Sequence, residues 1–523
     1  MVVRVQTREV MTTKTGERVG LERTLGLFSS TAIVAGSMVG SGIFLVAAEI
    51  ARITQSAGLF LAAWGVTALM TMIGALCYGE LAAMMPKAGG QYVYLREALG
   101  PMWGFLYGWT LFLVIQTGTI AAVCVGFGKF LGVFFPAVSS EHWLWHIAHV
   151  PVARVGPVAL GNMEIGVNTA NLAGLLLVVA LAVVNAFGVK LGAMVQNVFT
   201  TAKGLALVGM AVLGLTVGRH AAAMRANFGA GASAGWTRLH PLTTGVGGET
   251  AMVSVVVLLA VVQVGSLFSA DAWNNVTFTA GEVRDPQRNL PLSLLLGTGS
   301  VLALYFLISL AYLMVLPLMG DAHGATVMAR GIAHATDDRV GTAVLEAIFP
   351  GVGTGLMAAA ILISGFGCAN GMTLAGARVY YAMSRDGLFF RSVGRLSRRY
   401  RTPVMALAVQ AAWTVMLCVS GSFNQLLDYV MFAVLVFYIL TIAGLMVLRV
   451  KRPEAERPYR APGYPVLPMI YIAMATWICI VLLRYKPQYT WPGLGIVLLG
   501  IPVYFLWTRR GGNAGAGSLP ENG

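Results

Sequence analysis

The chain has 523 residues, of which 57% are hydrophobic and only 11% are charged, and its mean hydropathy is +0.76. A soluble protein of this length would carry far more charge, so the composition excludes a soluble globular protein and indicates a membrane protein. The size of the net charge, +14, would by itself be compatible with nucleic-acid binding. HExxH and P-loop motifs are missing, so an enzyme is not expected.

Twelve apolar stretches are each about long enough to cross a bilayer. They cover residues 25–51, 59–83, 102–130, 168–187, 194–217, 251–280, 292–318, 351–381, 404–421, 426–448, 465–483 and 492–508. The last stretch is short, so a count of eleven is also open. The sequence therefore predicts an all-α membrane protein with one membrane domain over 25–508, between a polar tail over 1–24 and a disordered tail over 509–523.

The basic residues divide unevenly between alternate loops. With the N-terminus inside, 23 of the 35 Lys and Arg residues fall in the inner loops and tails, and 9 fall in the outer loops. This is the positive-inside pattern of membrane proteins, and it predicts that both termini are cytoplasmic. The charge therefore orients the chain in the bilayer of the plasma membrane, and no nucleic-acid partner is expected.

The first apolar stretch contains the segment Gly36–Phe44, G-S-M-V-G-S-G-I-F. Glycine disfavours helix and serine competes for backbone groups, so this segment is expected to unwind in mid-membrane. Unpaired backbone groups are tolerated at that depth only where they line a cavity. The N–H groups that start the next half-helix would then attract an anion such as a carboxylate. A continuous helix that packs through its small residues is the alternative.

The outer loop over 131–167 holds His142, His146 and His149 at the i, i+4 and i+7 positions of one helical face. Metal binding fits this spacing, but no acid or thiol completes a site, so neither a metal nor another cofactor is expected. Because Trp143 and Trp145 lie beside these histidines, the segment is predicted to form an interfacial helix.

Lys203 is the clear basic exception at membrane depth, where ionisable residues are costly and are functional candidates. It could reach the first break as a fixed cation in place of a bound sodium ion, or it could release and regain a proton. A lysine that only hydrogen-bonds carbonyl groups for structure is the alternative.

The sixth apolar stretch is interrupted by Phe268–Trp273, F-S-A-D-A-W. Unwinding there would expose carbonyl groups that suit an ammonium group, so a zwitterionic amino acid would meet both breaks. Asp271 is the clear acidic residue at membrane depth. Three roles are open for it: contact with a cationic group of the substrate, uptake of a proton during transport, or a structural role in which backbone donors satisfy the carboxylate. Phe268 or Trp273 could cap a pocket, with core packing as the alternative. Two such breaks in two halves of a chain predict the binding site of a secondary transporter.

If the first and sixth stretches are equivalent, the chain contains two repeats of five helices, over about 25–217 and about 251–448. An odd number of helices in each repeat inverts the second repeat relative to the first. The last two helices, over about 465–508, then lie outside the repeats.

Several segments resemble the amino acid–polyamine–organocation superfamily and, within it, the L-type amino acid transporter family. Gly36–Phe44 is similar to the family's glycine motif, and the segment ending at Lys203 reads Q-N-V-F-T-T-A-K, close to the family's Q-[DN]-x-F-T-x-x-K. From Leu267 the chain reads L-F-S-A-D-A-W-N-N-V-T-F-T-A-G-E-V-R-D-P-Q-R-N-L-P, which is a specific match. The segments A-R-V-Y-Y-A-M-S-R-D-G from Ala377 and R-P-Y-R from Arg457 add to it.

The resemblance implies twelve helices in a five-plus-five inverted repeat, unwound first and sixth helices, and alternating access. It implies that a substrate carboxylate binds at the first break and that the ammonium group and side chain bind at the second. The substrate-binding residues that the resemblance implies are Ser37, Gly40, Ser41, Gly42, Ile43, Phe268, Ser269 and Asp271. Their neighbours Met38, Val39, Trp273 and Asn274 complete the predicted set. Lys203 matches the lysine that stands at the sodium site of sodium-coupled relatives, which argues against sodium coupling.

The chain also departs from the family pattern. Relatives often have an aromatic residue at the position of Ala270 and glycine at Ala272, and some members that accept dibasic amino acids carry aspartate at Asp271. Relatives often have a pair of glutamates in the segment after Trp273, whereas this chain reads T-A-G-E there and keeps only Glu282. All five cysteines lie in apolar stretches, so the disulfide-linked heavy chain of eukaryotic relatives is not expected, and the chain is predicted to be a monomer or homo-oligomer.

The sequence therefore predicts an amino acid transporter of the plasma membrane that works by exchange or by proton-coupled uptake, without sodium, with cationic amino acids among its candidate substrates. An amine or polyamine transporter, in which Asp271 holds an ammonium group and the carboxylate site is idle, is the alternative. A membrane enzyme and a sensor that binds without transport are the other rivals.

Overall fold

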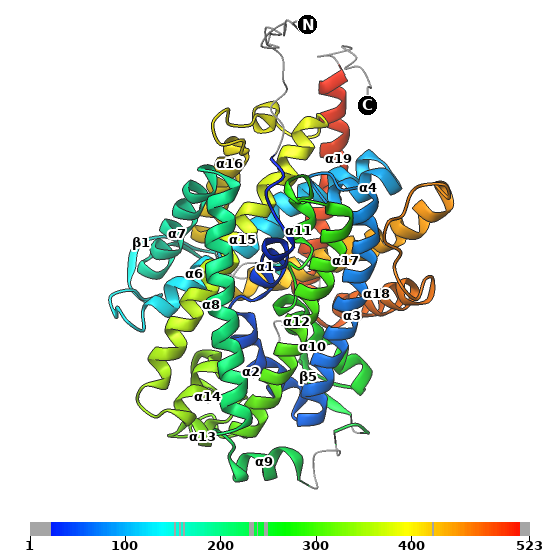
Figure 1. The fold of residues 1–523 in the computed structure, drawn as a ribbon. Coiled ribbons are helices and arrows are strands. Elements are labelled where there is room, and N and C mark those ends of the chain that lie inside the picture. Colours follow the sequence, from blue (N-terminus) through cyan, green and yellow to red (C-terminus); the bar gives the residue numbers. More distant parts are fainter. Residues whose placement is uncertain are drawn as a thin grey trace, which may run out of the picture.

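The computed structural model describes residues 22–150, 153–155, 158–160, 163–229, 235–237, 239–244, 249–420 and 423–512. Over these residues the chain forms a bundle of helices, with α4 and the end of α19 toward one end and α9 and α13 toward the other (Figure 1). Most of the two predicted tails lies outside the described residues, although α19 continues to Gly512.

The first half of the chain contains the predicted break and a π-helical segment, η1. Its helices are α1 (Leu27–Met38), α2 (Gly42–Thr54), α3 (Ala57–Met84), α4 (Gln91–Leu99), α5 (Pro101–Thr110), η1 (Leu111–Ile115), α6 (Gln116–Leu131), α7 (Thr169–Ala186), α8 (Val189–Leu215) and α9 (Ala221–Phe228). Helices α1 and α2 are bent by 41° relative to each other. The three residues between them are non-helical, as the low helix propensity of glycine and serine predicts.

The second half contains the other predicted break, between α10 and α11. Its helices are α10 (Val255–Ser269), α11 (Asn275–Phe278), η2 (Ala280–Glu282), α12 (Pro286–Val315), α13 (Val327–Arg330), η3 (Thr336–Asp338), α14 (Val340–Ile348), α15 (Gly353–Arg385), η4 (Arg391–Gly394), α16 (Val404–Ser420), α17 (Phe423–Lys451), α18 (Val466–Tyr485) and α19 (Pro487–Gly512). The segments η2, η3 and η4 are 3-10 helices.

Nine described helices are long and apolar enough to cross a membrane, and the bent pair α1 and α2 makes a tenth. Helices α10 and α16 are apolar but shorter, with 15 and 17 residues. The chain is thus a multi-span helical membrane protein. Helices lie over every predicted apolar stretch, while length and composition identify up to ten spans rather than twelve.

The prediction of an all-α chain is wrong for the loops, which contain three short two-stranded antiparallel sheets. The strands are β1 (Trp143–Val150), β2 (Ala153–Val155), β3 (Val158–Leu160), β4 (Met163–Asn168), β5 (His240–Thr244) and β6 (Glu249–Val253). They pair as β1 with β4, β2 with β3 and β5 with β6. The predicted interfacial helix around His142–His149 is a strand instead, because β1 pairs with β4. Spacing within 142–149 cannot reveal a pairing partner that lies about twenty residues further along the chain.

Helix α1 lies in the middle of the bundle (Figure 1), packed against α8, α12 and α15. Its Ile33 and Val34 are fully buried. Apolar residues on outer helices, such as Leu176 on α7 and Leu205 on α8, are instead more than half exposed. In a bilayer these side chains face lipid, so the arrangement surrounds the broken α1–α2 segment with protein.

Candidate functional site

Hydrogen bonds from two other helices satisfy the carbonyl groups at the break between α1 and α2. Lys203 Nζ, on α8, donates to the carbonyl oxygens of Gly36 at 2.5 Å and of Val39 at 2.6 Å. Ser364 Oγ, on α15, donates to the Val39 carbonyl at 3.0 Å. These donors replace the helical bonds that the unwound segment lacks, so the break is a built feature of the fold.

The backbone N–H groups at the start of α2 are unpaired. No acceptor within the described part of the chain takes the N–H groups of Ser41, Gly42 or Ile43. All three residues are buried, and buried N–H groups are normally paired. Because they form the positive end of a 13-residue helix, they offer a seat for a carboxylate.

The second break has the opposite polarity. The carbonyl groups of Ser269, Ala270 and Asp271, at the end of α10, accept no hydrogen bond from the residues that the structure describes. Ala272 has φ of 64°, a left-handed backbone conformation that costs a non-glycine residue about 1–2 kcal/mol. The end of α10 therefore presents unpaired acceptors that suit an ammonium group.

The two breaks touch each other. A Cβ atom built on Gly42 would lie 2.6 Å from Ser269 Oγ and 3.0 Å from Ser269 Cα. Only glycine permits this approach of the start of α2 to the end of α10. The unpaired donors and the unpaired acceptors are thereby brought to one place in the membrane domain.

A pocket lies beside the second break. Residues of α4, α5, η1, α6, α11, α15 and α17 line the pocket together with the second break. They are Gln91, Tyr107, Leu111, Ile115, Gln116, Thr119, Asp271, Ala272, Asn274, Asn275, Phe278, Met372, Val434 and Tyr438. Of the predicted substrate-binding residues, Asp271 and Asn274 are in this lining. The predicted residues of the first break, Ser37 to Ile43, and also Phe268, Ser269 and Trp273, are not.

Asp271 is fixed by a residue that the sequence did not single out. Tyr438 Oη, on α17, donates to Asp271 Oδ1 at 2.6 Å. The ring of Tyr438 packs edge-on against Tyr78, with centroids 5.8 Å apart. The hydrogen bond from Tyr438, whose ring is itself held by Tyr78, fixes the carboxylate of Asp271 at the pocket wall.

Trp273 and Phe268 are packed within the protein. Trp273 is 2% exposed, and its ring meets Tyr78 edge-on with a centroid distance of 4.8 Å. A Cβ on Gly74 would lie 3.1 Å from the Trp273 ring. Phe268 is 9% exposed. The structure thus shows packing contacts for these residues, and a role as a gate of the pocket stays a prediction for both.

Asn274 belongs to a chain of buried amides. Its Nδ2 donates to Gln91 Oε1 at 2.9 Å, and Gln91 Nε2 donates to Thr441 Oγ1 at 3.0 Å. Gln91 and Gln116 are polar residues in or beside apolar stretches, and this feature of the sequence could have identified them as site residues. Tyr438 and Tyr107 carried no comparable signal, since aromatic residues are common in membrane helices.

Lys203 reaches the first break as predicted, and it is 1% exposed. No ion pair within the described ranges involves it, so its positive charge is compensated by carbonyl dipoles. Its role in coupling remains a prediction. Glu282, the remaining member of the acidic pair, forms a buried ion pair with Arg378 at 3.1 Å, and no His/Cys/Asp/Glu group suited to a metal occurs among the described residues.

The family model described as amino acid permease matches residues 25–502. The human b(0,+)-type amino acid transporter 1 is 28% identical over 97% of this chain and 91% of its own length. The serine/threonine exchanger SteT of Bacillus subtilis is 25% identical over 94% of this chain and 98% of its own length.

A third relative, the mouse large neutral amino acids transporter small subunit 2, is 28% identical over 94% of this chain and 82% of its own length. All three relatives are transporters rather than enzymes. Since the family model covers both breaks and the pocket, the chain belongs to the amino acid permease family of the amino acid–polyamine–organocation superfamily, among relatives of the L-type amino acid transporters.

Proposed function

We propose that this chain is a secondary active transporter that carries amino acids across the plasma membrane by alternating access. The observation that carries this proposal is the close packing of Gly42 against Ser269, which places the segment with the unpaired N–H groups of Ser41–Ile43 beside the segment with the unpaired carbonyl groups of Ser269–Asp271. A zwitterion with both charges on one α-carbon matches donors and acceptors that lie this close. An ion with one charge leaves one of the two sets buried and unpaired, which costs about 1–3 kcal/mol for each group.

The substrate side chain is proposed to enter the pocket beside the second break. Asp271 and Asn274 provide its polar wall, and Leu111, Ile115 and Met372 provide apolar contacts. Asp271 would favour a cationic side chain by direct charge pairing. A neutral substrate would instead leave Asp271 to its bond with Tyr438.

The proposed architecture is twelve helices in a five-plus-five inverted repeat, with both termini in the cytoplasm. The two broken helices, α1–α2 and α10–α11, supply its support, because they meet at the centre of the bundle as equivalent members of two repeats would. Alternating access then consists of movements of these helices around the fixed contact of Gly42 with Ser269.

Transport is proposed to be sodium-independent, by exchange or by proton-coupled uptake. Lys203 Nζ places a positive charge on the carbonyl groups of Gly36 and Val39, where a sodium ion would otherwise be coordinated. The exchange activity in the name of the Bacillus subtilis relative supports exchange. A disulfide-linked heavy chain is not expected, since all five cysteines are buried, and we infer a monomer or homo-oligomer.

An amine or polyamine transporter is the second candidate, favoured by the single carboxylate of Asp271 at the pocket wall. In that case Asp271 would hold the ammonium group, and the N–H groups of α2 would have no anion to bind. Matched pairs of ligands separate the two candidates, because arginine and agmatine, or ornithine and putrescine, differ only by the α-carboxylate.

The experiment is a thermal-stability screen of the purified chain against the twenty amino acids, ornithine, agmatine and putrescine, followed by flux measurements in proteoliposomes. A ligand of the native state raises apparent stability by mass action. The proposal expects amino acids to stabilise the protein and their decarboxylated partners to do so at least tenfold less effectively. Stabilisation by the amines alone would transfer the assignment to the second candidate, and binding without flux would refute transport.

A further inference from the structure

Three arginines project from one short turn between α15 and α16. The turn is Ser397–Thr402, and Arg398, Arg399 and Arg401 are exposed within it. No acidic residue occurs between 387 and 403, and none of the three arginines has an ion pair among the described residues. The turn thus carries three positive charges with no ion-pair partner in the described part of the chain, and Arg399 lies over the Tyr400 ring at 5.3 Å from its centroid.

The turn is a fixed structure. The N–H of Ser397 donates to the Thr402 carbonyl at 2.9 Å, and the N–H of Arg401 donates to the Ser397 carbonyl at 2.9 Å. Thr402 Oγ1 donates to the Ala186 carbonyl at the end of α7 at 2.9 Å. The Tyr400 ring meets Phe187 edge-on, with centroids 5.6 Å apart. The three arginines are therefore presented from a turn that is anchored to α7.

Two apolar stripes converge on this turn. Helix α16 starts two residues after Thr402, and Val404, Met405 and Met416 on it are 39%, 46% and 59% exposed. Helix α7, which packs against α16, exposes Leu176 and Val183 and is followed by the exposed Phe187. Exposed apolar side chains of membrane helices face acyl chains, so the arginines lie at the level where the acyl region ends.

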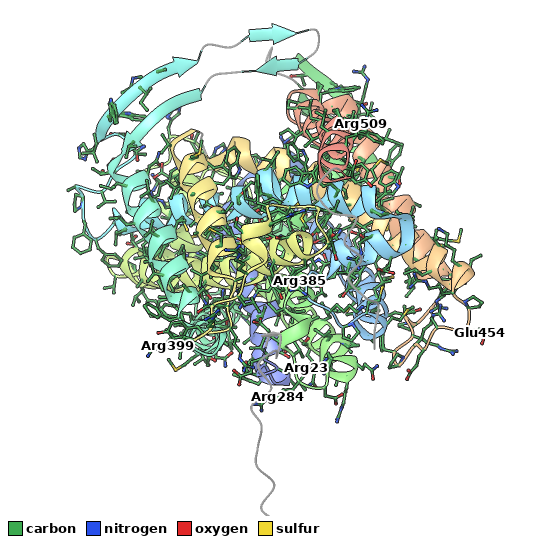
Figure 2. All side chains as sticks on the ribbon, turned by 90° about the horizontal axis from the view of Figure 1, so that it is seen from above. Arg23, Arg284, Arg385, Arg399, Glu454 and Arg509 are labelled. Carbon is green, nitrogen blue, oxygen red and sulfur yellow. The ribbon has the colours of Figure 1, made fainter. Side chains whose placement is uncertain are left out.

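The turn lies at the rim of the bundle. Figure 2 shows Arg399 at the rim and Arg385 nearer the middle of the bundle. The rim position places Arg399 beside lipid rather than over the centre of the bundle. A guanidinium group binds phosphate oxygens through paired hydrogen bonds, which an ammonium group does not provide.

We propose that the turn Ser397–Thr402 is a binding site for an anionic phospholipid, with the headgroup phosphate held by Arg398, Arg399 and Arg401 and the acyl chains along the exposed faces of α7 and α16. Clustered basic residues directly next to a membrane helix bind anionic headgroups with a contribution from each residue. The hydrogen-bonded turn and the two exposed apolar helix faces beside it distinguish this arginine cluster from a run of charged residues that is only solvated by water.

The test is native mass spectrometry of the full chain in detergent, titrated with equal amounts of phosphatidylglycerol and phosphatidylcholine. The unmodified chain should retain phosphatidylglycerol preferentially. The triple variant Arg398→Gln, Arg399→Gln, Arg401→Gln should bind it roughly five-fold more weakly for each arginine, or on the order of 100-fold in total.

The matched control is the triple variant Arg23→Gln, Arg284→Gln, Arg288→Gln, which removes the same charge and should keep the preference. The triple variant Arg398→Lys, Arg399→Lys, Arg401→Lys preserves the charge and guards against misfolding, and it should bind phosphatidylglycerol at intermediate strength. Undiminished preference in the glutamine variant of the turn, or an equal loss in the control, would overturn the proposal.

Discussion

Gly42 is the position at which the two breaks can be forced apart by a single methyl group. In Gly42→Ala the new Cβ would lie 2.6 Å from Ser269 Oγ, 3.0 Å from its Cα and 3.1 Å from its Cβ. The Oγ can rotate away, but the backbone contact at Cα can lengthen only if α2 and α10 separate by several tenths of an ångström. That movement displaces the donors of α2 from the acceptors of α10.

The expected loss follows from the size of this clash. Overpacking by one methylene costs about 1–3 kcal/mol, and if the ligand must bring the two breaks back together, its affinity falls by about 5- to 150-fold. The assay is equilibrium binding of whichever amino acid stabilises the unmodified chain most, with the melting temperature recorded in parallel. The same ligand is used for every variant.

Gly65→Ala is the matched control, because no heavy atom lies within 4 Å of a Cβ built there. It should leave affinity unchanged and stabilise α3 by up to about 1 kcal/mol. Ser269→Gly removes two of the three close contacts of Gly42→Ala, so the double variant should bind better than the sum of the two single losses predicts. Unchanged affinity in a destabilised Gly42→Ala protein would refute a carboxylate site at the start of α2.

Three further changes test other parts of the proposed site and fold. Lys203→Ala should leave a folded protein whose flux falls at least tenfold, since the cation at the break is lost; failure to fold, seen by size-exclusion chromatography, would favour a purely structural lysine. Asp271→Asn should weaken cationic amino acids by about 2–4 kcal/mol in binding assays and neutral ones by less than 1 kcal/mol, and an equal loss for both would assign Asp271 to coupling or structure. Glu346 accepts hydrogen bonds from the N–H groups of Gly351 at 2.6 Å and Thr354 at 3.0 Å, and the bond from Gly351 holds the pKa of this carboxyl below its ordinary value of 4.5. The carboxylate therefore stabilises the fold above that value and loses its contribution as the pH falls through the lowered pKa; the difference in melting temperature between Glu346→Gln and the unmodified chain should be present at neutral pH and vanish in acid, and a pH-independent difference would contradict this.

The positions of the helices were predictable because membrane depth imposes one rule on the whole chain. In lipid every backbone group needs a partner, so long apolar stretches must be helices, and helices lie over all twelve predicted stretches. The loops obey no such rule. The strand β1 forms because β4 pairs with it, and its own residues, read as a helical face, gave the wrong secondary structure.

The residues of the two breaks were visible in the sequence, since Gly, Ser and Asp in mid-membrane conflict with an unbroken helix. The other residues around the site were not. Tyr438 on α17 is one of many aromatic residues in apolar stretches, and its bond to Asp271 joins positions 167 residues apart. Such a contact depends on how α17 packs against the end of α10, which local spacing does not encode.

By itself, the sequence determined that the chain is a multi-span helical membrane protein, where its helices are interrupted, and which ionisable residues lie at membrane depth, because the cost of polar groups in lipid acts on each segment separately. Only the tertiary structure decided that Gly42 meets Ser269, that Lys203 reaches the carbonyl groups of Gly36 and Val39, and that the pocket borders the second break but not the first. These are distances between segments far apart in the chain, and they are fixed by the simultaneous packing of helices that no single segment specifies.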